Sequence, residues 1–250
     1  MRVRIHTAPV SEAFLSGDEC PFCYLERQAL ESTIRFVAGP SASYMEPGVR
    51  AVTDEVGFCR THIKSLYDYG NALGSALMMQ TYFAGLIEDF QREAEKFPVP
   101  GKRPLLGRRK APGGEPLWQR IEAKADSCYV CNQVEEYVER YYLTFFHMVK
   151  EEEFRHRVEN CKGFCMPHFA RLLRTAEDHL PEGQREWFYA TVFPLMENNL
   201  VRVKEDLDWL IAKYDYRNAG ADWRNSRDAL QRTMQKLEGG NPAEPPYRKE

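Results

Sequence analysis

The sequence predicts an all-α protein of two pseudo-repeated helical halves, each stapled by a Cys3His metal site and packed into one helical bundle. Three observations predict this class. Apolar residues recur at helical spacing along most of the chain, and no convincing period-two alternation is present. Six of the seven cysteines and two histidines form two matching sets. A stretch rich in proline and glycine separates the sets.

The spacing of cysteine and histidine defines the repeat. Each copy reads C-x2-C, then a long gap, then G-F-C-x2-H, and the second C-x2-C follows the first by 108 positions. The metal-ligand candidates are Cys20, Cys23, Cys59 and His62 in the first copy, and Cys128, Cys131, Cys165 and His168 in the second. We expect each copy to bind one ion within its own half.

Composition divides the chain into four segments. Residues 97–116 contain five prolines, four glycines and five basic residues, which predicts an exposed linker. The expected segments are a first helical half over 1–96, this linker, a second half with the C-terminal helices over 117–238, and a disordered tail over 239–250.

Apolar periodicity predicts a helix after each metal motif and two helices near the C-terminus. The expected helical segments are Leu25–Val37, Ile63–Phe90, Val134–Phe145, Phe169–Leu173, Trp187–Ile211 and Leu230–Leu237.

Helix length constrains the path of the chain. A straight helix from Cys131 to Arg157 would run ~40 Å, and the eight steps from Arg157 to Cys165 return at most ~27 Å. One ion can bind both cysteines only if the segment folds back, so we expect a reversal between Phe146 and Glu153. Gly39-Pro40 is the corresponding turn in the first half.

Three thiolates and one imidazole suit tetrahedral Zn(II) in a closed, structural site. We therefore expect two Zn(II) ions per chain, each clamped between two helix starts, where the helix dipole favours thiolate. The alternatives are Cys3His-ligated iron–sulfur clusters and ordinary buried cysteines. Cys20-Pro21-Phe22-Cys23 also resembles a redox pair, but no strand pattern precedes it. Cys161 is a spare thiol or a substitute ligand.

A late segment offers a ligand or partner surface. It is dense in aromatic and hydrogen-bonding side chains, and its candidate residues are Tyr216, Arg217, Asn218, Trp223 and Asn225. The alternative is a loop packed between two helices. No nucleophile elbow, phosphate loop or H-E-x-x-H motif is present, so no catalytic residue is assigned and an enzyme is disfavoured.

The net charge and the N-terminal sequence limit the classes of partner and the cellular compartments that we expect. The net charge of −3 argues against a dedicated nucleic-acid binder, and no apolar stretch follows the N-terminal Met-Arg-Val-Arg. The uncharged run Gly70–Ile87 contains Asn71, Gln80 and three glycines, which favours a buried helix over a membrane span. We expect a cytoplasmic protein with a protein partner, or a homodimer.

The twin motifs, together with Tyr214–Asn218 and Asp222–Leu230, resemble a bacterial family of unknown function, number 6062. The resemblance covers roughly residues 18–238, without the linker and the tail. It implies an intracellular, metal-binding helical protein with the eight ligands named above, and it carries no established activity. Our functional hypothesis is a zinc-stabilised interaction or adaptor scaffold. The alternatives are an iron–sulfur redox protein and an enzyme with a pocket between the halves.

Overall fold

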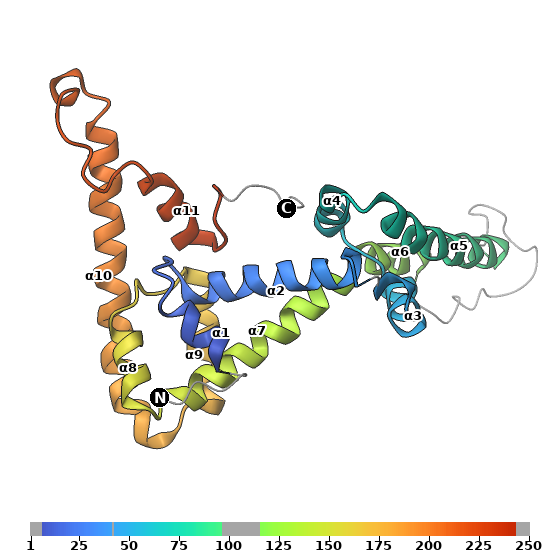
Figure 1. Cartoon of the computed structure of the whole chain (residues 1–250), viewed down its shortest axis with the longest axis horizontal. Helices are drawn as coiled ribbons and strands as arrows, with labels where there is room; N and C mark the ends of the chain where they lie inside the picture. Colours follow the sequence, from blue (N-terminus) through green and yellow to red (C-terminus); the bar gives the residue numbers. More distant parts are fainter. Residues whose placement is uncertain (1–6, 42, 97–115, 244–250) are drawn as a thin grey trace, which may run out of the picture. The chain divides into compact units, whose positions relative to one another are not determined.

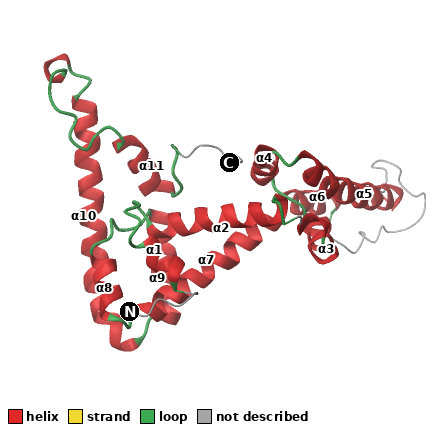
Figure 2. Cartoon of the chain, viewed as in Figure 1, coloured by secondary structure: helices red, strands yellow, loops and turns green. Residues whose placement is uncertain are grey.

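The computed structural model describes residues 7–41, 43–96 and 116–243. These residues form eleven α-helices and three short 3-10 turns, with no strand among them (Figure 2). The predicted all-α class is therefore confirmed. The pseudo-repeat of the two halves, as a structural repeat, stays a prediction.

The chain divides into two compact units. Among the described residues, unit 1 takes 7–30 and 134–243, and unit 2 takes 31–41, 43–96 and 116–133. The division falls inside one helix at residues 30 and 31 and inside another at residues 133 and 134. Each unit therefore draws residues from both of the expected segments, 1–96 and 117–238.

Unit 1 is built from the two ends of the chain. Figure 1 shows its helices in order from blue to red: α1 (Ala8–Ala13), the start of α2 (Pro21–Ala38), most of α7 (Tyr129–Met148), α8 (Glu152–Glu159), α9 (Met166–His179), α10 (Arg185–Ala212) and α11 (Ala229–Glu238). The short turns η2 (Glu182–Gln184) and η3 (Tyr216–Asn218) precede and follow α10.

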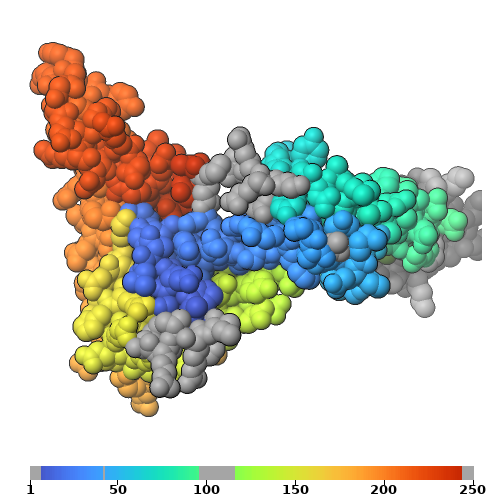
Figure 3. Space-filling model, in the orientation of Figure 1, coloured from blue at the N-terminus to red at the C-terminus, as the bar shows by residue number. Residues whose placement is uncertain are grey.

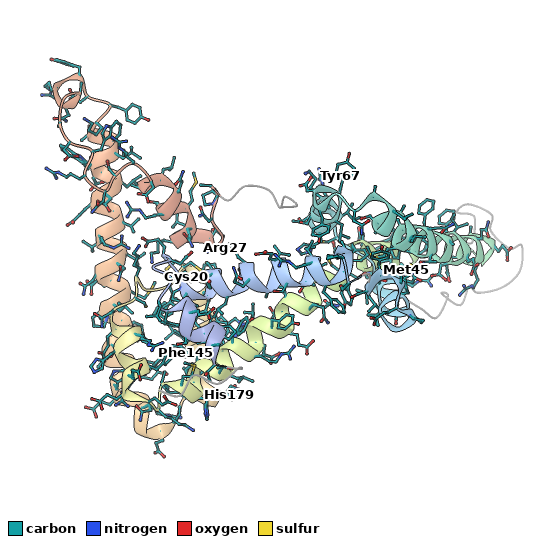
Figure 4. The ribbon with its side chains drawn as sticks, in the orientation of Figure 1. Cys20, Arg27, Met45, Tyr67, Phe145 and His179 are labelled. Atoms are coloured by element: carbon teal, nitrogen blue, oxygen red, sulfur yellow. The ribbon has the colours of Figure 1, made fainter. Side chains whose placement is uncertain are left out.

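Aromatic side chains fill the core of unit 1. Phe22 in the first turn of α2 stacks on Tyr142 of α7 with ring centroids 3.9 Å apart, and both side chains are fully buried. Phe14 packs against Phe145 and Phe154, so the N-terminal segment lies against α7 and α8 (Figures 3 and 4). This core fixes the start of α2 beside α9, where the first metal-ligand group lies.

Unit 2 contains the middle of the chain. It holds the end of α2, the turn η1 (Ser43–Met45), and four helices: α3 (Pro47–Val56), α4 (Arg60–Tyr69), α5 (Ala72–Lys96) and α6 (Leu117–Asp126), followed by the first turn of α7. The predicted single helix over Ile63–Phe90 is wrong. Gly70 adopts φ +81, a left-handed conformation that ends α4, and α5 begins two residues later.

Burial of the uncharged run also differs from the prediction. Gly74 and Met78 are buried, but Leu73, Phe83 and Ile87 on α5 are exposed, Phe83 to 60%. The prediction of a fully buried helix is therefore wrong for this segment. In the described part of the chain, no helix combines the length and the apolar character that crossing a bilayer requires.

The two predicted reversals are present. α2 ends at Ala38, immediately before Gly39-Pro40, and α7 ends at Met148, with three residues between it and the start of α8. The predicted linker lies outside the described residues except for Pro116. Of the predicted tail, 244–250 also lie outside them, whereas Gly239 ends α11 with φ +79.

Candidate metal centres

All four metal motifs place their ligands in the same way. The first cysteine of each motif is the residue before a helix, and the second ligand is the third residue of that helix, as the bounds of α2, α4, α7 and α9 show. The carbonyl of each first cysteine accepts the N–H four residues later, which starts the helix, at Cys20, Cys59, Cys128 and Cys165. The prediction that the ligands stand at helix starts is confirmed.

The Gly-Phe-Cys frames share a backbone conformation. Gly57 has φ +72 and Gly163 has φ +75, a region that favours glycine. Cys59 (φ −72, ψ 165) and Cys165 (φ −78, ψ 161) are both extended N-cap residues. Each glycine therefore allows the sharp turn that brings the following cysteine to the start of its helix.

The eight ligands form two groups, but not the two predicted ones. Cys20 and Cys23 lie with Cys165 and His168 in unit 1, whereas Cys59 and His62 lie with Cys128 and Cys131 in unit 2. We call these the unit 1 site and the unit 2 site. The prediction that each half closes on its own ion is wrong, because each C-x2-C motif meets the C-x2-H motif of the other half.

Helix length explains the exchange. α7 continues without a break for 20 residues after Cys128, which carries the chain ~30 Å, whereas α8 has only 8 residues and returns ~12 Å. The chain therefore reaches Cys165 beside the start of α2 rather than beside Cys131. α2, with 18 residues, separates Cys23 from Cys59 in the same way.

In the unit 1 site the donor atoms converge on one point. His168 Nδ1 lies 3.5 Å from Cys20 Sγ, 3.4 Å from Cys23 Sγ and 3.1 Å from Cys165 Sγ. The sulfurs of Cys23 and Cys165 are 3.6 Å apart. All four residues are buried, and Figure 4 marks Cys20 at the start of α2.

The unit 2 site has the same geometry with more exposure. His62 Nδ1 lies 3.3 Å from each of the three sulfurs, those of Cys59, Cys128 and Cys131. Cys59 Sγ and Cys131 Sγ are 3.8 Å apart. Cys128 is buried, but Cys131 is exposed.

These separations fit one tetrahedral ion. With Zn–S and Zn–N bonds of usual length, two sulfurs stand about 3.8 Å apart, and a sulfur and a nitrogen about 3.6 Å apart. The donor atoms of each group all lie within 4.8 Å of one another. A multi-iron cluster spreads its thiolates over several irons and separates them further, and a disulfide would bring two sulfurs to about 2.05 Å. All seven cysteines are free.

The pKa values of the cysteine and histidine side chains favour a bound cation at both sites. Burial raises the pKa of Cys20, and the contact with Cys165 raises it further. Burial and the neighbouring Cys128 raise the pKa of Cys131 to about 12. Burial lowers the pKa of His168 to about 4, which leaves the imidazole neutral near pH 7. Three adjacent thiols ionise together only when a positive charge joins them, and a divalent cation supplies it.

At Cys59 the start of α4 lowers the pKa of the thiol, which is opposite to the effect of burial. Burial raises the pKa of this thiol, but the backbone N–H of His62 and contacts with Cys128 and Cys131 outweigh burial, and the net pKa is lowered. This is the effect expected of free N–H groups in the first turn of a helix.

The two sites differ in the hydrogen bonds that link their C-x2-C and C-x2-H motifs. In unit 2 the N–H of Tyr129 donates to the carbonyl of Gly57 at 2.9 Å. Pro21 occupies the equivalent position in unit 1 and has no N–H. There the buried ammonium of Lys236 donates to the carbonyls of Glu19 and Lys162, each at 2.5 Å. A side chain of α11 thus links the segments that precede the two motifs of the unit 1 site.

Further groups surround the unit 1 site. Glu26 Oε2 lies 3.7 Å from His168 Nε2, the ring nitrogen that faces away from the sulfurs. Tyr142 donates its hydroxyl to the carbonyl of His168 at 3.1 Å. A carboxylate behind a metal-binding histidine orients the ring and raises its basicity. The backbone of Gly239 lies against the sulfurs, since a Cβ there would stand 3.5 Å from Cys165 Sγ.

The predicted ligand or partner surface is mostly a self-contained loop. Lys213 donates to the carbonyls of Asn218, Ala219 and Ala221, and Asn218 donates to the carbonyl of Ala212. Arg217 forms an ion pair with Asp215, and Tyr216 is exposed. The ammonium of Lys213 lies over the ring of Trp223. Of the five predicted residues, Asn225 lines a cavity, and Cys161 lines the same cavity rather than joining the metal-ligand group.

The comparisons with known proteins concern the whole chain. No curated protein and no solved structure matches it. One family profile, described as a family of unknown function (DUF6062), matches residues 1–244, a wider range than the expected 18–238 that includes the 97–116 linker. Because the match spans nearly the full length, the chain belongs to the DUF6062 family of unknown function.

Proposed function

We propose that this protein is a zinc-binding helical scaffold in which two structural Zn(II) ions each join the first half of the chain to the second. One observation carries the proposal. Twice in the structure, three cysteine sulfurs and one histidine Nδ1 from two helix starts gather at the spacing of a single tetrahedral ion.

A structural role follows from the ligand sets. The protein supplies all four donors of each group, which leaves no open coordination position for a substrate. Cys23 and Cys165 are 142 positions apart and Cys59 and Cys131 are 72 apart, so each ion closes a long loop. Zinc binding to such sets contributes on the order of 10 kcal/mol to folding at neutral pH, which is comparable to the stability of a whole domain.

The first experiment determines the metal. Protein purified without oxygen and without added metal is analysed for its elements and for visible absorbance. We expect two zinc ions per chain and a colourless solution. Iron with a broad visible band would instead support the iron–sulfur alternative and contradict the proposal.

The interaction role rests on apolar exposure in unit 2. Large apolar side chains of α4, α5 and α6 are open to solvent, among them Tyr67 (80%), Leu73 (69%), Phe83 (60%), Phe90 (60%) and Trp118 (59%). Exposed apolar surface of this extent is typical of a protein-binding surface. The proposed setting is the reducing cytoplasm of a bacterium, where free thiols persist to bind metal.

A matched pair of variants tests the interaction role. Zinc-loaded wild-type protein serves as bait in extract of its own cells. The test variant is Phe83→Ser/Phe90→Ser on α5, and the control is Phe193→Ser on α10, because Phe193 is similarly exposed. We expect one partner that wild type and Phe193→Ser retain in stoichiometric amount and the α5 variant loses. Equal recovery by all three baits would contradict this role.

A further inference from the structure

A polar cavity of about 590 Å³ lies in unit 1, apart from the donor atoms of the metal site. Its walls come from α10, from the loop that leads into α11, and from the connection between α8 and α9. α10 and α11 pack side by side next to it (Figure 1). Its volume lies within the range of small-molecule binding sites.

The lining carries an excess of positive charge. Five basic and three acidic side chains line it, in a protein whose net charge is −3. The acids are already engaged. Glu19 accepts from Arg202 at 2.6 Å, and Arg232 bridges Asp206 and Asp228 at 2.9 Å each.

Two guanidinium groups remain without a carboxylate among the described residues, those of Arg224 and Arg227. Each is stacked on a tryptophan instead. The guanidinium carbon of Arg224 lies 4.1 Å from the ring centroid of Trp209, and that of Arg227 lies 5.6 Å from that of Trp223. Stacking holds the planar fork in place and leaves its N–H donors open.

The backbone at Arg224 is strained. Its φ of +50 is the only positive φ of a non-glycine residue in the described chain. A residue held in this region without glycine or asparagine costs about 1 kcal/mol or more, and such strain clusters at binding sites. The side chain that this strained backbone presents is one of the two unpaired guanidinium groups of the cavity.

We propose that this cavity binds a small phosphate monoester, with the phosphate held by Arg224 and Arg227. A phosphate monoester has a charge of about −1.5 to −2 at pH 7, which matches the two unpaired guanidinium groups. Arginine forks bind phosphate oxygens in a bidentate manner. The cavity is larger than a phosphate ion alone requires, and it has room for the esterified part.

Titration calorimetry on the full metal-loaded chain tests the proposal. The probes are glycerol 3-phosphate, ribose 5-phosphate and glucose 6-phosphate, each compared with its unphosphorylated counterpart and with inorganic phosphate. We expect at least one ester to bind about tenfold or more tightly than both controls. Absence of saturable binding by all three esters, or tighter binding of an oligonucleotide than of any ester, would overturn it.

Variants separate binding from folding. Arg224→Gln and Arg227→Gln should each weaken ester binding about tenfold or more, the usual value of a charge-assisted contact. Arg217→Gln is the matched control, because Arg217 belongs to the same loop but pairs with Asp215 and does not line the cavity. An equal loss of binding in Arg217→Gln would overturn the assignment.

Arg224→Gly provides the sharper test. Glycine adopts φ +50 without strain, so the melting temperature should stay within a few degrees while ester binding is lost. Unchanged ester binding would show that Arg224 does not hold the phosphate, and a large fall in melting temperature with loss of metal would show that Arg224 serves the fold. Either result would contradict the proposal. Because Arg224 is not one of the eight candidate metal ligands, failure of this proposal leaves the proposed zinc role standing.

Discussion

The sulfur of Cys23 lies 3.6 Å from the sulfur of Cys165, although 142 positions separate them in the chain. The unit 1 site therefore joins the two ends of unit 1, and the whole of residues 31–133, which contribute the described part of unit 2, lies within the loop that it closes. The unit 2 site is nested inside that loop. This topology would give an ion at each of the two sites a separate structural task.

Metal release should occur in two steps. All four ligands of the unit 1 site are buried, whereas Cys131 of the unit 2 site is exposed. A chelator reaches the exposed thiolate first, so release followed with a zinc indicator dye should show a fast phase and a slow phase of equal amplitude. Cys131→Ser should remove the fast phase alone. A single phase in wild type, or loss of the slow phase in Cys131→Ser, would count against the assignment.

Lys236 should be essential to unit 1. Its buried ammonium donates to the carbonyls of Glu19 and Lys162 and lies 3.3 Å from Glu19 Oε2. Lys236→Met keeps the length of the side chain but leaves these acceptors buried and unpaired, at a cost of about 3–5 kcal/mol. Urea unfolding would measure it, with Lys204→Met as the control, because Lys204 is exposed. Equal midpoints for the two variants would refute this role.

Gly57 should not tolerate a side chain. Its φ is +72, and an added Cβ would lie 2.6 Å from the ring of Tyr82. Gly57→Ala should destabilise unit 2 by about 1–3 kcal/mol and weaken metal binding at Cys59. Gly85→Ala is the matched control in α5, where a Cβ meets no atom within 4 Å. That change should raise stability by about 0.5–1 kcal/mol, and thermal unfolding would compare the two.

Phe22 should contribute the largest single apolar term near the unit 1 site. Phe22 stands between the two cysteines of its motif in the sequence, and its ring is fully buried and stacks on Tyr142. Phe22→Ala should cost about 3–5 kcal/mol, seen as a lower unfolding midpoint with the unit 2 metal retained. A change below about 1 kcal/mol would show that the stacked pair is not part of the core.

The sequence predicted the local structure around each motif well. The helix starts, the eight ligands and the reversals at Gly39-Pro40 and after Met148 depend on short-range patterns. A cysteine or histidine three residues along faces the same side of a first helical turn whatever the rest of the chain does. These features could therefore be predicted without knowledge of tertiary contacts.

The pairing of the motifs could not be predicted in the same way. Spacing identifies ligands but does not show which C-x2-C motif meets which C-x2-H motif. The unbroken length of α7 is the feature that decides between the two pairings, because it carries the chain far from Cys131 before it turns.

Other features left no clear trace in the sequence. The break between α4 and α5 at Gly70 interrupts an apolar pattern that continues on both sides. Lys236 stands near the end of an amphipathic helix, where a lysine is ordinarily solvated, and the two carbonyls that its buried ammonium contacts belong to residues distant in the sequence. Arg224 and Arg227 lie in a segment with a dense hydrogen-bonding pattern, but the cavity that they line forms only when α10 and α11 pack.

The metal content of two double variants tests most directly whether each ion joins the two halves of the chain. Cys23→Ser/Cys165→Ser removes two ligands of the unit 1 site, whereas Cys23→Ser/Cys59→Ser removes one ligand from each site. Both variants are dialysed against a chelator under conditions that leave wild type with two ions. Cys23→Ser/Cys165→Ser should then retain one ion per chain, whereas Cys23→Ser/Cys59→Ser should have both sites less than fully occupied. The reverse result, with one full ion in Cys23→Ser/Cys59→Ser and none in Cys23→Ser/Cys165→Ser, would contradict the exchanged pairing.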